Sequence, residues 1–440
     1  MKKVYVETYG CQMNVSDSER VASQLERLGY SIADSEETAD VVLLNTCSVR
    51  EKAEQKLYTR AGQLKRVEGP RKIVGVMGCV AQLEGNNLFK QDRGIDFVIG
   101  TKAVGRVGDA IAAAVEGEKR ILDLGEREED YDWLPIKSQR HSPYVAFVPI
   151  IEGCNKFCTY CIVPFSRGRE KSLEASEIIR HVLELRREGV KEVHLIGQNV
   201  NSYRPKSESG LEAFKGTTPF SRLLRAVAAT GIERVKFTTS FPRDYHADIT
   251  DAINEHENLC NWVHLPVQSG SDSVLRAMKR GHTVESYKKK VDSIRSSPRN
   301  ISLSTDIIVG FPGETEKDFM ETCDLFEYCE YDSAYIFKYS PRPGTPAAEL
   351  EDDVSTDQKK HRFLELEKIQ RKMLQRSFER KKGSVLRVLA EKPSGREGQL
   401  SGHSPCQTVV NFEGDEEHLG TIVDVVVTEA KRNTLFGEIR

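Results

Sequence analysis

The 440-residue sequence contains no run of about 18 apolar residues, so it has no segment suited to crossing a membrane as a helix. Its first residues, MKKVYVETYG, lack the apolar stretch of a secretory signal peptide. Lysine and arginine number 64 against 67 acidic residues, which excludes a polycation and confines any nucleic-acid surface to local patches. We therefore expect a cytoplasmic protein of two or three domains.

Disulfide bonds are also not expected, although the chain has ten cysteines. Thiols in a reducing compartment are more often metal ligands than disulfide partners. Four of the ten cysteines have no ligand spacing, and we interpret them as structural thiols: Cys260, Cys323, Cys329 and Cys406.

The most specific motif lies in residues 150–170, IIEGCNKFCTYCIVPFSRGRE, where Cys154, Cys158 and Cys161 have the spacing C-x3-C-x2-C. Three thiolates this close can bind three irons of a 4Fe–4S cluster. The surrounding sequence has no fourth thiol, so one iron would stay open, as is typical of catalytic metal sites. The alternatives are three unrelated thiols or a zinc site that uses the poorly spaced His141.

A second set of cysteines follows three similar apolar runs. KVYVETYG precedes Cys11, DVVLLNTC ends at Cys47, and KIVGVMGC ends at Cys79. Each run is typical of a strand buried on both faces of a parallel sheet, and helix signals follow, including a capping box at Ser16 and Glu19. Because parallel strands end at one edge of a sheet, the three thiols could converge and hold a second open cluster. The alternative is three buried core thiols.

The spacing of these elements predicts a Rossmann-like parallel α/β domain over residues 1–117, followed by a charge-rich linker over 118–143. From 144 to 373, alternating strand and helix patterns predict a partial (βα) barrel. Polar residues and one glycine, the first of the segment GFPGET, lie where the strands of this barrel should end. They are Gln198, Asn199, Ser240, Gln268, Asp306 and Gly310. Such positions fit a bound cofactor or, equally, ordinary turns.

The C-terminal part begins with a basic helix that starts near Thr356 and stops at Gly383. Residues 374–440 then show short β-rich runs that predict a small antiparallel β-barrel, which is not itself basic. A phosphate-binding stripe is a plausible use of the helix, and a solvated surface is the alternative. The candidate RNA contacts are Lys372, Arg376, Arg380 and Lys381 on the helix, with Arg167 and Arg169 beyond the cysteine loop.

The loop at Cys154 resembles the radical S-adenosylmethionine (SAM) superfamily, whose signature is C-x3-C-x-aromatic-C, with Tyr160 at the aromatic position. Together with TYGCQMNVSDSE, NTCSVREKAEQK, GQNVNSY, HLPVQSGSD, DIIVGFPGETE and YSPRPGTPA, it resembles the methylthiotransferase family over nearly the whole chain. The resemblance implies an N-terminal methylthiotransferase domain, a radical SAM core and a C-terminal TRAM domain. It also carries over all six cluster cysteines.

The resemblance implies a tRNA-modifying enzyme that transfers a methylthio group to carbon 2 of N(6)-isopentenyladenosine at position 37. It implies two SAM molecules and two 4Fe–4S clusters, since carbon 2 bears a C–H bond that no ordinary base removes. SAM contacts would include Tyr160 and the six polar and glycine positions of the barrel; no side chain is assigned as catalytic. We expect a monomer that binds the anticodon stem-loop, with electron and sulfur donors of unknown identity.

Two alternatives stay open. One keeps the enzyme class but changes the substrate to threonylcarbamoyl-adenosine in tRNA or to a ribosomal protein. The other is an RNA-binding module with structural metal, which the basic helix and the small barrel would suit.

Overall fold

The fold was obtained as a computed structural model, which describes residues 2–48, 51–64, 71–91, 94–125 and 140–440. The chain forms two compact units. The first comprises Met1–His141, Phe147–Asn155 and Cys161–Lys171, and the second comprises Ser142–Ala146, Lys156–Tyr160 and Ser172–Arg440. Within the described residues, no helix combines the length and the apolar character needed to cross a bilayer.

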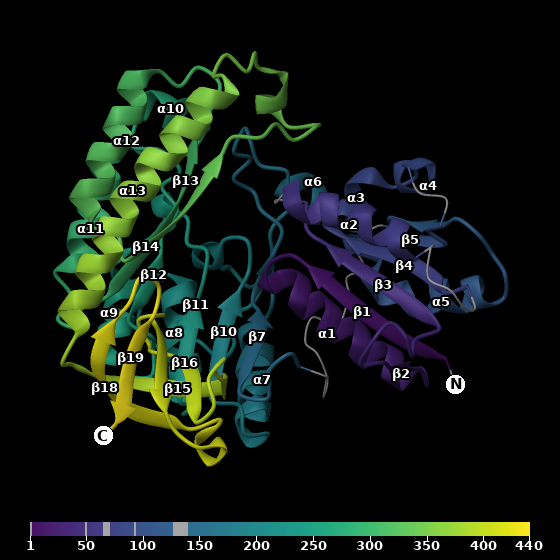
Figure 1. Ribbon diagram of the computed structural model, residues 1–440, viewed down its shortest axis with the longest axis horizontal. Coiled ribbons are helices and arrows are strands. Elements are labelled where there is room, and N and C mark those ends of the chain that lie inside the picture. Colours follow the sequence, from purple (N-terminus) through teal and green to yellow (C-terminus); the bar gives the residue numbers. More distant parts are fainter. Residues whose placement is uncertain (1, 49–50, 65–70, 92–93, 126–139) are drawn as a thin grey trace. The chain divides into compact units, whose positions relative to one another are not determined.

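The first unit is built on a six-stranded parallel sheet with helices on both faces (Figure 1). In sheet order the strands are β2 (Ser31–Ile32), β1 (Lys3–Tyr9), β3 (Val41–Thr46), β4 (Ile73–Gly78), β5 (Phe97–Gly100) and β6 (Ile121–Asp123). The helices are α1 (Gln12–Arg27), α2 (Glu51–Leu64), α3 (Cys79–Glu84), α4 (Asn87–Gln91), α5 (Val107–Val115) and α6 (Val163–Arg167), with a 3-10 turn η1 (Thr101–Arg106).

Strand β3 explains why this sheet needs helices on both sides. All six of its residues are buried, and alternate side chains point to opposite faces. Val41 and Leu43 pack with α1 and α5, whereas Val42 and Leu44 pack with α2, α3 and α4. The continuous apolar run in the sequence is therefore the signature of a strand that contributes to two cores.

Two details of the first unit differ from expectation. Helix α1 begins at Gln12 with Cys11 as its N-cap, so the predicted capping box at Ser16 and Glu19 lies inside the helix, where both side chains are buried. The segment predicted as a linker contributes the short edge strand β6, and its residues 126–139 lie outside the described part of the chain.

The second unit contains the partial barrel. One sheet has the order β11 (Arg234–Phe237), β10 (Glu192–Ile196), β7 (Val145–Pro149); β10 and β11 are parallel, and only Val145 and Ala146 of β7 belong to the second unit. A second sheet, in which all strands are parallel, has the order β12 (Trp262–His264), β13 (Ser302–Val309), β14 (Ser333–Lys338). A parallel bridge between Val235 and Leu259 joins β11 to the segment that leads into β12. A short pair, β8 (Ile151–Glu152) with β9 (Lys171–Ser172), flanks the cysteine loop.

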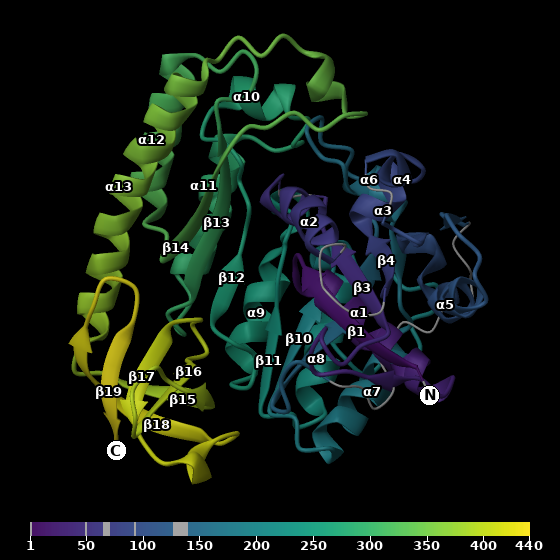
Figure 2. The ribbon, with the colours of Figure 1, turned by 45° about the vertical axis from the view of Figure 1, so that its right-hand side comes forward.

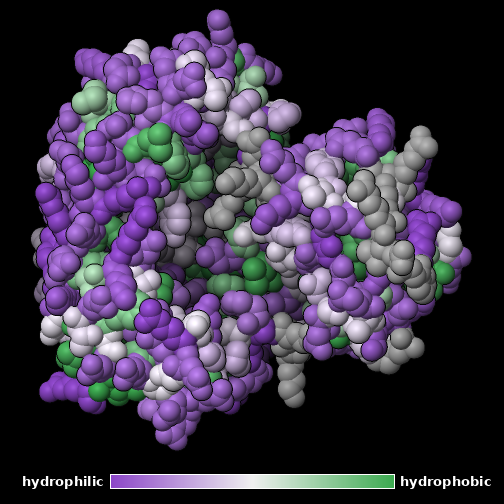
Figure 3. Space-filling view, in the orientation of Figure 1, coloured by the Kyte–Doolittle hydropathy of each residue, from purple (hydrophilic) through white to green (hydrophobic). Residues whose placement is uncertain are grey.

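Helices line the outside of this barrel, and α11, α12 and α13 run along β13 and β14 (Figure 2). Their outward surface is predominantly hydrophilic (Figure 3). The helices are α7 (Ala175–Arg187), α8 (Pro219–Ala229), α9 (Ala247–Glu255), α10 (Asp272–Ala277), α11 (Val284–Arg295), α12 (Glu316–Cys329) and α13 (Thr356–Lys381), with 3-10 turns η2 (Val200–Ser202), η3 (Pro242–Asp244) and η4 (Pro346–Glu349). Helix α13 begins at Thr356, as predicted.

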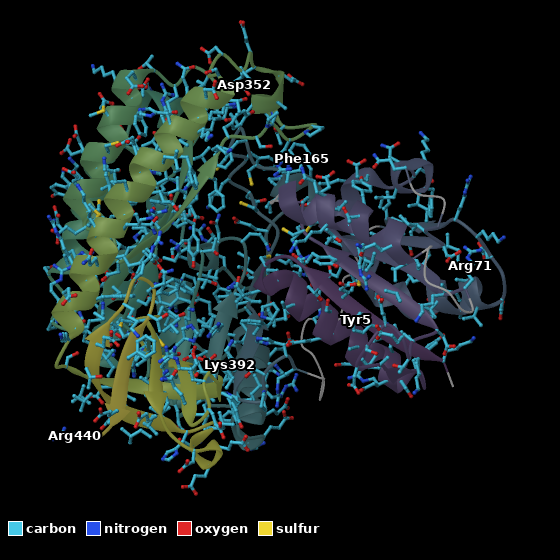
Figure 4. The ribbon with its side chains drawn as sticks, viewed as in Figure 1. Tyr5, Arg71, Phe165, Asp352, Lys392 and Arg440 are labelled. Carbon is cyan, nitrogen blue, oxygen red and sulfur yellow. The ribbon has the colours of Figure 1, made fainter. Side chains whose placement is uncertain are left out.

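The last residues form a closed five-stranded barrel around Val388, Phe412 and Val425. Its order is β15 (Val385–Pro393), β16 (Gln399–His403), β17 (Val409–Glu413), β19 (Leu435–Ile439), β18 (Ile422–Ala430), with a 3-10 turn η5 (Glu416–His418). Neighbouring strands are antiparallel except β17 and β19, which are parallel. Lys392 on β15 and Arg440 at the chain end mark this barrel in Figure 4.

A buried arginine fastens the small barrel to the core of the second unit. Arg234 on β11 donates to the carbonyl oxygens of His403 (2.8 Å) and Arg387 (2.5 Å). Its guanidinium also lies 3.4 Å from Glu192, and both side chains are only 4% exposed. Despite burial, hydrogen bonding with His194 and the nearby cations lower the pKa of Glu192 to about 2. The pair is therefore charged.

We expect Arg234→Met to lower the apparent free energy of unfolding of the second unit by about 3–5 kcal/mol. The substitution removes a buried countercharge of Glu192 and leaves the carbonyl oxygens of His403 and Arg387 without their donor. Arg180→Met is the matched control, since Arg180 pairs with Glu184 on an exposed helix face and should change stability by about 0.3–0.5 kcal/mol. Urea unfolding measures both. Equal midpoints for the two variants would contradict an anchoring role for Arg234.

Candidate cluster-binding and radical SAM site

The first unit brings Cys11, Cys47 and Cys79 to one edge of its sheet. Cys47 and Cys79 directly follow β3 and β4, and Cys11 stands two residues beyond β1 as the N-cap of α1. These three strands are neighbours in register, and the Cys47 amide donates to the carbonyl of Tyr9 at 2.9 Å. Hence thiols separated by more than 30 residues in sequence meet at adjacent carboxyl ends of strands.

Two buried asparagines, which the sequence reasoning missed, hold these strand ends together. Asn14 donates to the side chain of Asn45 at 3.0 Å, and Asn45 donates to the Asn14 carbonyl at 2.8 Å and to Ser18 at 2.9 Å. Asn14 also accepts from the Cys11 thiol and amide, each at 3.4 Å. In the sequence, the only indication of this role is that each asparagine lies close to a cysteine, Asn14 in CQMN and Asn45 in NTC.

Arg167 lies against the same thiols and not at the surface. Its guanidinium donates to Asp17 at 2.6 Å and to Glu152 at 3.2 Å, and its side chain is 3% exposed. Its positive charge also lowers the pKa of the Cys79 thiol, against the effect of burial. The prediction that Arg167 contacts RNA is therefore wrong, because a buried and doubly paired guanidinium is not available to phosphate.

The electrostatics of the site suit bound thiolates. Hydrogen bonding with Cys47 lowers the pKa of Cys11 below its ordinary value, and the charge of Arg167 acts in the same direction. Burial raises the pKa of Cys79, and the Arg167 cation opposes that rise. The buried site thus contains one permanent cation beside three thiols.

The donor set fits an iron–sulfur cluster better than a single ion. Among the described residues, no three His, Cys, Asp or Glu side chains are grouped as ligands of one metal ion. A 4Fe–4S cluster binds each thiolate to a different iron, so its ligands stand further apart than those of one ion, and it is bound by Cys thiolates alone. Three thiols on three strand ends, without carboxylate or imidazole ligands, match that requirement.

The loop of Cys154, Cys158 and Cys161 crosses the boundary between the units. In the first unit, Gly153 has φ +80°, and a Cβ there would lie 2.2 Å from the Arg169 carbonyl, so glycine permits the close approach of the two chain segments. The Cys154 amide then donates to the Gly168 carbonyl at 3.0 Å. Phe165 projects from α6 on the surface (Figure 4).

In the second unit, Arg280 lies beside the part of this loop that carries Cys158. One guanidinium nitrogen is 3.5 Å from the Cys158 sulfur and 3.5 Å from the Tyr160 hydroxyl, and the other donates to the Pro266 carbonyl at 2.6 Å. Its guanidinium stacks over Phe241 at 4.3 Å. Arg280 is a second functional candidate that the sequence reasoning missed, and its motif, MKRGH, carried no ligand spacing.

Most of the predicted SAM residues follow strands of the partial barrel. Gln198 and Asn199 come after β10, and Ser240 comes after β11 with a buried hydroxyl that no described residue satisfies. Gln268 has φ +78° and exchanges backbone hydrogen bonds with Asp306 and Ile308 at 2.9 Å each. Polar side chains therefore follow the carboxyl ends of strands, where barrels bind their ligands. Among them, Ser240 has an unsatisfied hydroxyl and Gln268 a left-handed backbone.

Two predicted SAM residues are placed differently. Asp306 is the fifth of eight residues in β13 and not at its end. Gly310 does follow β13, with φ +71°, but a Cβ there would lie 2.3 Å from Lys359 Cγ. The space beside Gly310 is therefore filled by a lysine of α13 and not left for a cofactor. Its amide donates to Glu314.

The remaining predicted RNA contacts lie on the surface. Lys372 and Arg376 are exposed on α13 and form no ion pair with any described residue. Arg380 lies 3.5 Å from Glu330 at the surface, and Lys381 is held by Ser377 at 2.8 Å and by Asp332 at 3.7 Å. Arg169 is exposed. Two cations of the predicted stripe are thus unpaired and two are partly neutralised.

Family comparisons cover three segments of the chain. Residues 3–100 match the family described as uncharacterized protein family UPF0004, residues 148–326 match the radical SAM superfamily, and residues 379–439 match the TRAM domain. Among solved structures, the radical S-adenosylmethionine methyltransferase TsrM from Kitasatospora setae has a similar fold, with a TM-score of 0.60 and 13% identity. The similarity covers 79% of this chain and 75% of that one.

Similarity to curated proteins extends over the full length. The tRNA-2-methylthio-N(6)-dimethylallyladenosine synthase of Shewanella sp. (strain ANA-3) is 42% identical over 99% of this chain and 92% of its own length. The enzyme of the same name from Alteromonas mediterranea is 43% identical over 100% of this chain and 92% of its own. At this identity and coverage, and with its radical SAM and TRAM domains, this chain belongs to the family of radical SAM tRNA-2-methylthio-N(6)-dimethylallyladenosine synthases.

Proposed function

We propose that this enzyme transfers a methylthio group to carbon 2 of N(6)-dimethylallyladenosine, the isopentenylated adenosine at position 37 of tRNA. The observation that carries the proposal is the presence of two separate three-cysteine sets in one chain, one on a radical SAM loop and one at three adjacent strand ends. Full-length relatives of this name support the substrate.

The cofactors are SAM and two 4Fe–4S clusters. Cys154, Cys158 and Cys161 would hold one cluster, and Cys11, Cys47 and Cys79 would hold the other. When bound, these groups supply what side chains lack: a SAM-derived radical able to break an unactivated C–H bond, and an open metal position for the transferred sulfur.

The protein's own residues position and shield these groups. The hydrogen bonds between Asn14 and Asn45 fix β1, α1 and β3 relative to one another, so that Cys11 and Cys47 keep their spacing. Arg167 places a desolvated positive charge beside the thiolates, which offsets part of their negative charge. Arg280 donates toward Cys158 and fixes the loop against Pro266.

Further parts of the proposal rest on the sequence. The domain boundaries are 1–117, a linker over 118–143, a radical SAM core over 144–373 and an RNA-binding TRAM domain over 374–440. SAM would contact Tyr160, Gln198, Asn199, Ser240 and Gln268, and the tRNA would contact Arg169, Lys372, Arg376, Arg380 and Lys381. We expect a monomer in the cytoplasm, served by separate electron and sulfur donors.

Nucleoside mass analysis of tRNA from a strain that lacks this gene tests the substrate. We expect 2-methylthio-N(6)-dimethylallyladenosine to disappear and its unthiolated precursor to accumulate, and both changes to revert when the gene is restored. An unchanged amount of 2-methylthio-N(6)-dimethylallyladenosine in the tRNA would contradict this substrate assignment. Loss of methylthiolated threonylcarbamoyl-adenosine instead would favour the alternative substrate.

The charge of Arg167 can be tested by a redox titration of the second cluster alone. Combining Arg167→Met with alanine at Cys154, Cys158 and Cys161 leaves only the Cys11, Cys47 and Cys79 set. We expect a more negative midpoint potential and a cluster affinity about 10–100-fold weaker, because the site loses the buried cation beside its thiolates.

Arg167→Lys in the same background is the matched control, since it keeps the charge and should retain most of the potential. Electron paramagnetic resonance follows both titrations. If Arg167→Met leaves the potential and the spectrum of the reduced cluster unchanged, Arg167 serves only to join α6 to α1.

A further inference from the structure

One face of the β12–β13–β14 sheet carries mainly polar and aromatic side chains. The parallel register pairs His264 with Ser304, Asp306 with Tyr335, and Ile308 with Phe337, so paired side chains lie on the same face. His264 bonds Ser304 at 2.9 Å and lies 3.5 Å from Asp306. We call the set His264, Asp306, Ile308, Tyr335 and Phe337 the aromatic face.

The opposite face of this sheet is an ordinary core. Val263, Leu303 and Ile307 are at most 1% exposed there, because helices cover that side (Figure 2). Helix α13 lies along β14, and its Gln370 donates to the carbonyl of Ala334, whose buried side chain shares this face. The aromatic face is therefore the barrel's inner face.

Two large aromatic side chains on this inner face are not buried. Tyr335 is 54% exposed and Phe337 is 39% exposed, and the Tyr335 ring meets the His264 ring edge-on with centroids 6.0 Å apart. Tyr328, a comparably exposed tyrosine on the outer helix α12, is instead engaged by Asp292 through its hydroxyl at 2.8 Å. Exposed aromatic rings beside a partly exposed carboxylate are typical of a surface that binds a planar polar ligand.

The inner face differs at its two ends. At the amino end of the strands, Trp262 is buried under Lys236, whose ammonium lies 4.6 Å from the ring centre and bonds Gln407 of the small barrel. At the carboxyl end, Ile308 packs against the same apolar cluster as Tyr160 of the radical SAM loop. The exposed aromatic residues thus continue into the cofactor-binding loop.

We propose that the aromatic face binds the substrate adenine of the tRNA after that base has left its stack. Tyr335 stacks on the purine, Asp306 accepts the N6–H, and Phe337 with Ile308 contacts the dimethylallyl group. This inference rests on the proposed function. Enzymes that modify bases extrude them, and aromatic stacking contributes about 1–3 kcal/mol per base.

The order of side chains along the strands favours this ligand. The pair Asp306 and Tyr335 combines an acceptor with a ring, whereas the next pair on the same face, Ile308 and Phe337, is wholly apolar. An N6-alkylated adenine has the same succession: a flat ring, one N–H donor, and a branched apolar substituent. Unmodified adenine would leave the Ile308 and Phe337 end without a partner.

Binding of two anticodon stem-loop RNAs tests the inference in the reconstituted enzyme. One RNA carries N(6)-dimethylallyladenosine at the target position, and the other carries adenosine. We expect Tyr335→Ala to weaken binding of both RNAs by about 5- to 150-fold, because stacking does not depend on the substituent. Phe337→Ala should weaken binding of the dimethylallyl RNA by about 10-fold or more and leave the adenosine RNA nearly unchanged.

Tyr328→Ala is the matched control and should bind both RNAs as the wild type does. Tyr335→Phe should also keep its affinity, because the ring is retained. Wild-type affinity in Tyr335→Ala and Phe337→Ala would overturn the inference, as would equal losses in Tyr328→Ala. Reduced SAM cleavage in the absence of RNA would also overturn it, by assigning the face to SAM. If the wild-type enzyme does not modify the dimethylallyl RNA, the proposed function itself fails.

Discussion

Replacing Cys47 by alanine should eliminate methylthiolated product while SAM cleavage continues. Cys47 is buried directly after β3 and interacts with Cys11, so its loss removes one of the three ligands that we propose for the sulfur-transfer cluster. The loss of product should exceed the about 10–100-fold effect typical of residues that only support a metal ligand. Release of 5′-deoxyadenosine and product formation are measured in the same reaction.

Cys260→Ala is the control for this variant, because Cys260 is an equally buried thiol of the second unit with a pKa raised to about 12 by burial. It should retain both activities. Methylthiolated RNA from Cys47→Ala at wild-type rates would show that the second set of cysteines is structural. Loss of both activities would mean that the two cysteine sets are not separable.

Cys158→Ala should abolish SAM cleavage and product together. Cys158 belongs to the only cysteine loop in the sequence with the C-x3-C-x2-C spacing, and Arg280 lies 3.5 Å from its sulfur. Without this ligand the radical-generating site is incomplete, so no step that depends on SAM cleavage can follow. Anaerobic assays of 5′-deoxyadenosine release and RNA mass measure both losses.

Cys323→Ala provides the comparison for Cys158→Ala, since Cys323 lies on α12 in the same unit and is buried to the same degree. It should cleave SAM normally. If Cys158→Ala still released 5′-deoxyadenosine at the wild-type rate, the loop would not hold the cluster that cleaves SAM.

The positions of Cys11, Cys47 and Cys79 relative to the sheet were predictable, because a repeated strand and helix pattern determines where parallel strands end. Helix α1 was less predictable. Ser16 and Glu19 satisfy the spacing of a capping box, but Cys11, two residues beyond β1, caps the helix five residues earlier. The tertiary position of the strand end overrode the local signal.

Arg167 and Tyr335 show what the sequence did not reveal. The segment RGRE has the composition of a surface loop, and only the packing of α6 against the first unit places the Arg167 guanidinium between Asp17 and Glu152. Strand β14, SAYIFK, has one face against α13 and one facing the barrel interior, and alternation alone does not say which. The sequence predicts Asp306 at the end of a strand, whereas the structure places it inside β13. The sequence pattern does not define how far β13 extends beyond this residue.

The most direct test of two catalytic clusters in one chain is a count of iron and acid-labile sulfide after anaerobic reconstitution. We predict about eight irons and eight sulfides per wild-type chain, and about four of each when either Cys11, Cys47 and Cys79 or Cys154, Cys158 and Cys161 are replaced by alanine. About four irons in the wild type, or bound zinc in place of iron at either set, would contradict the account.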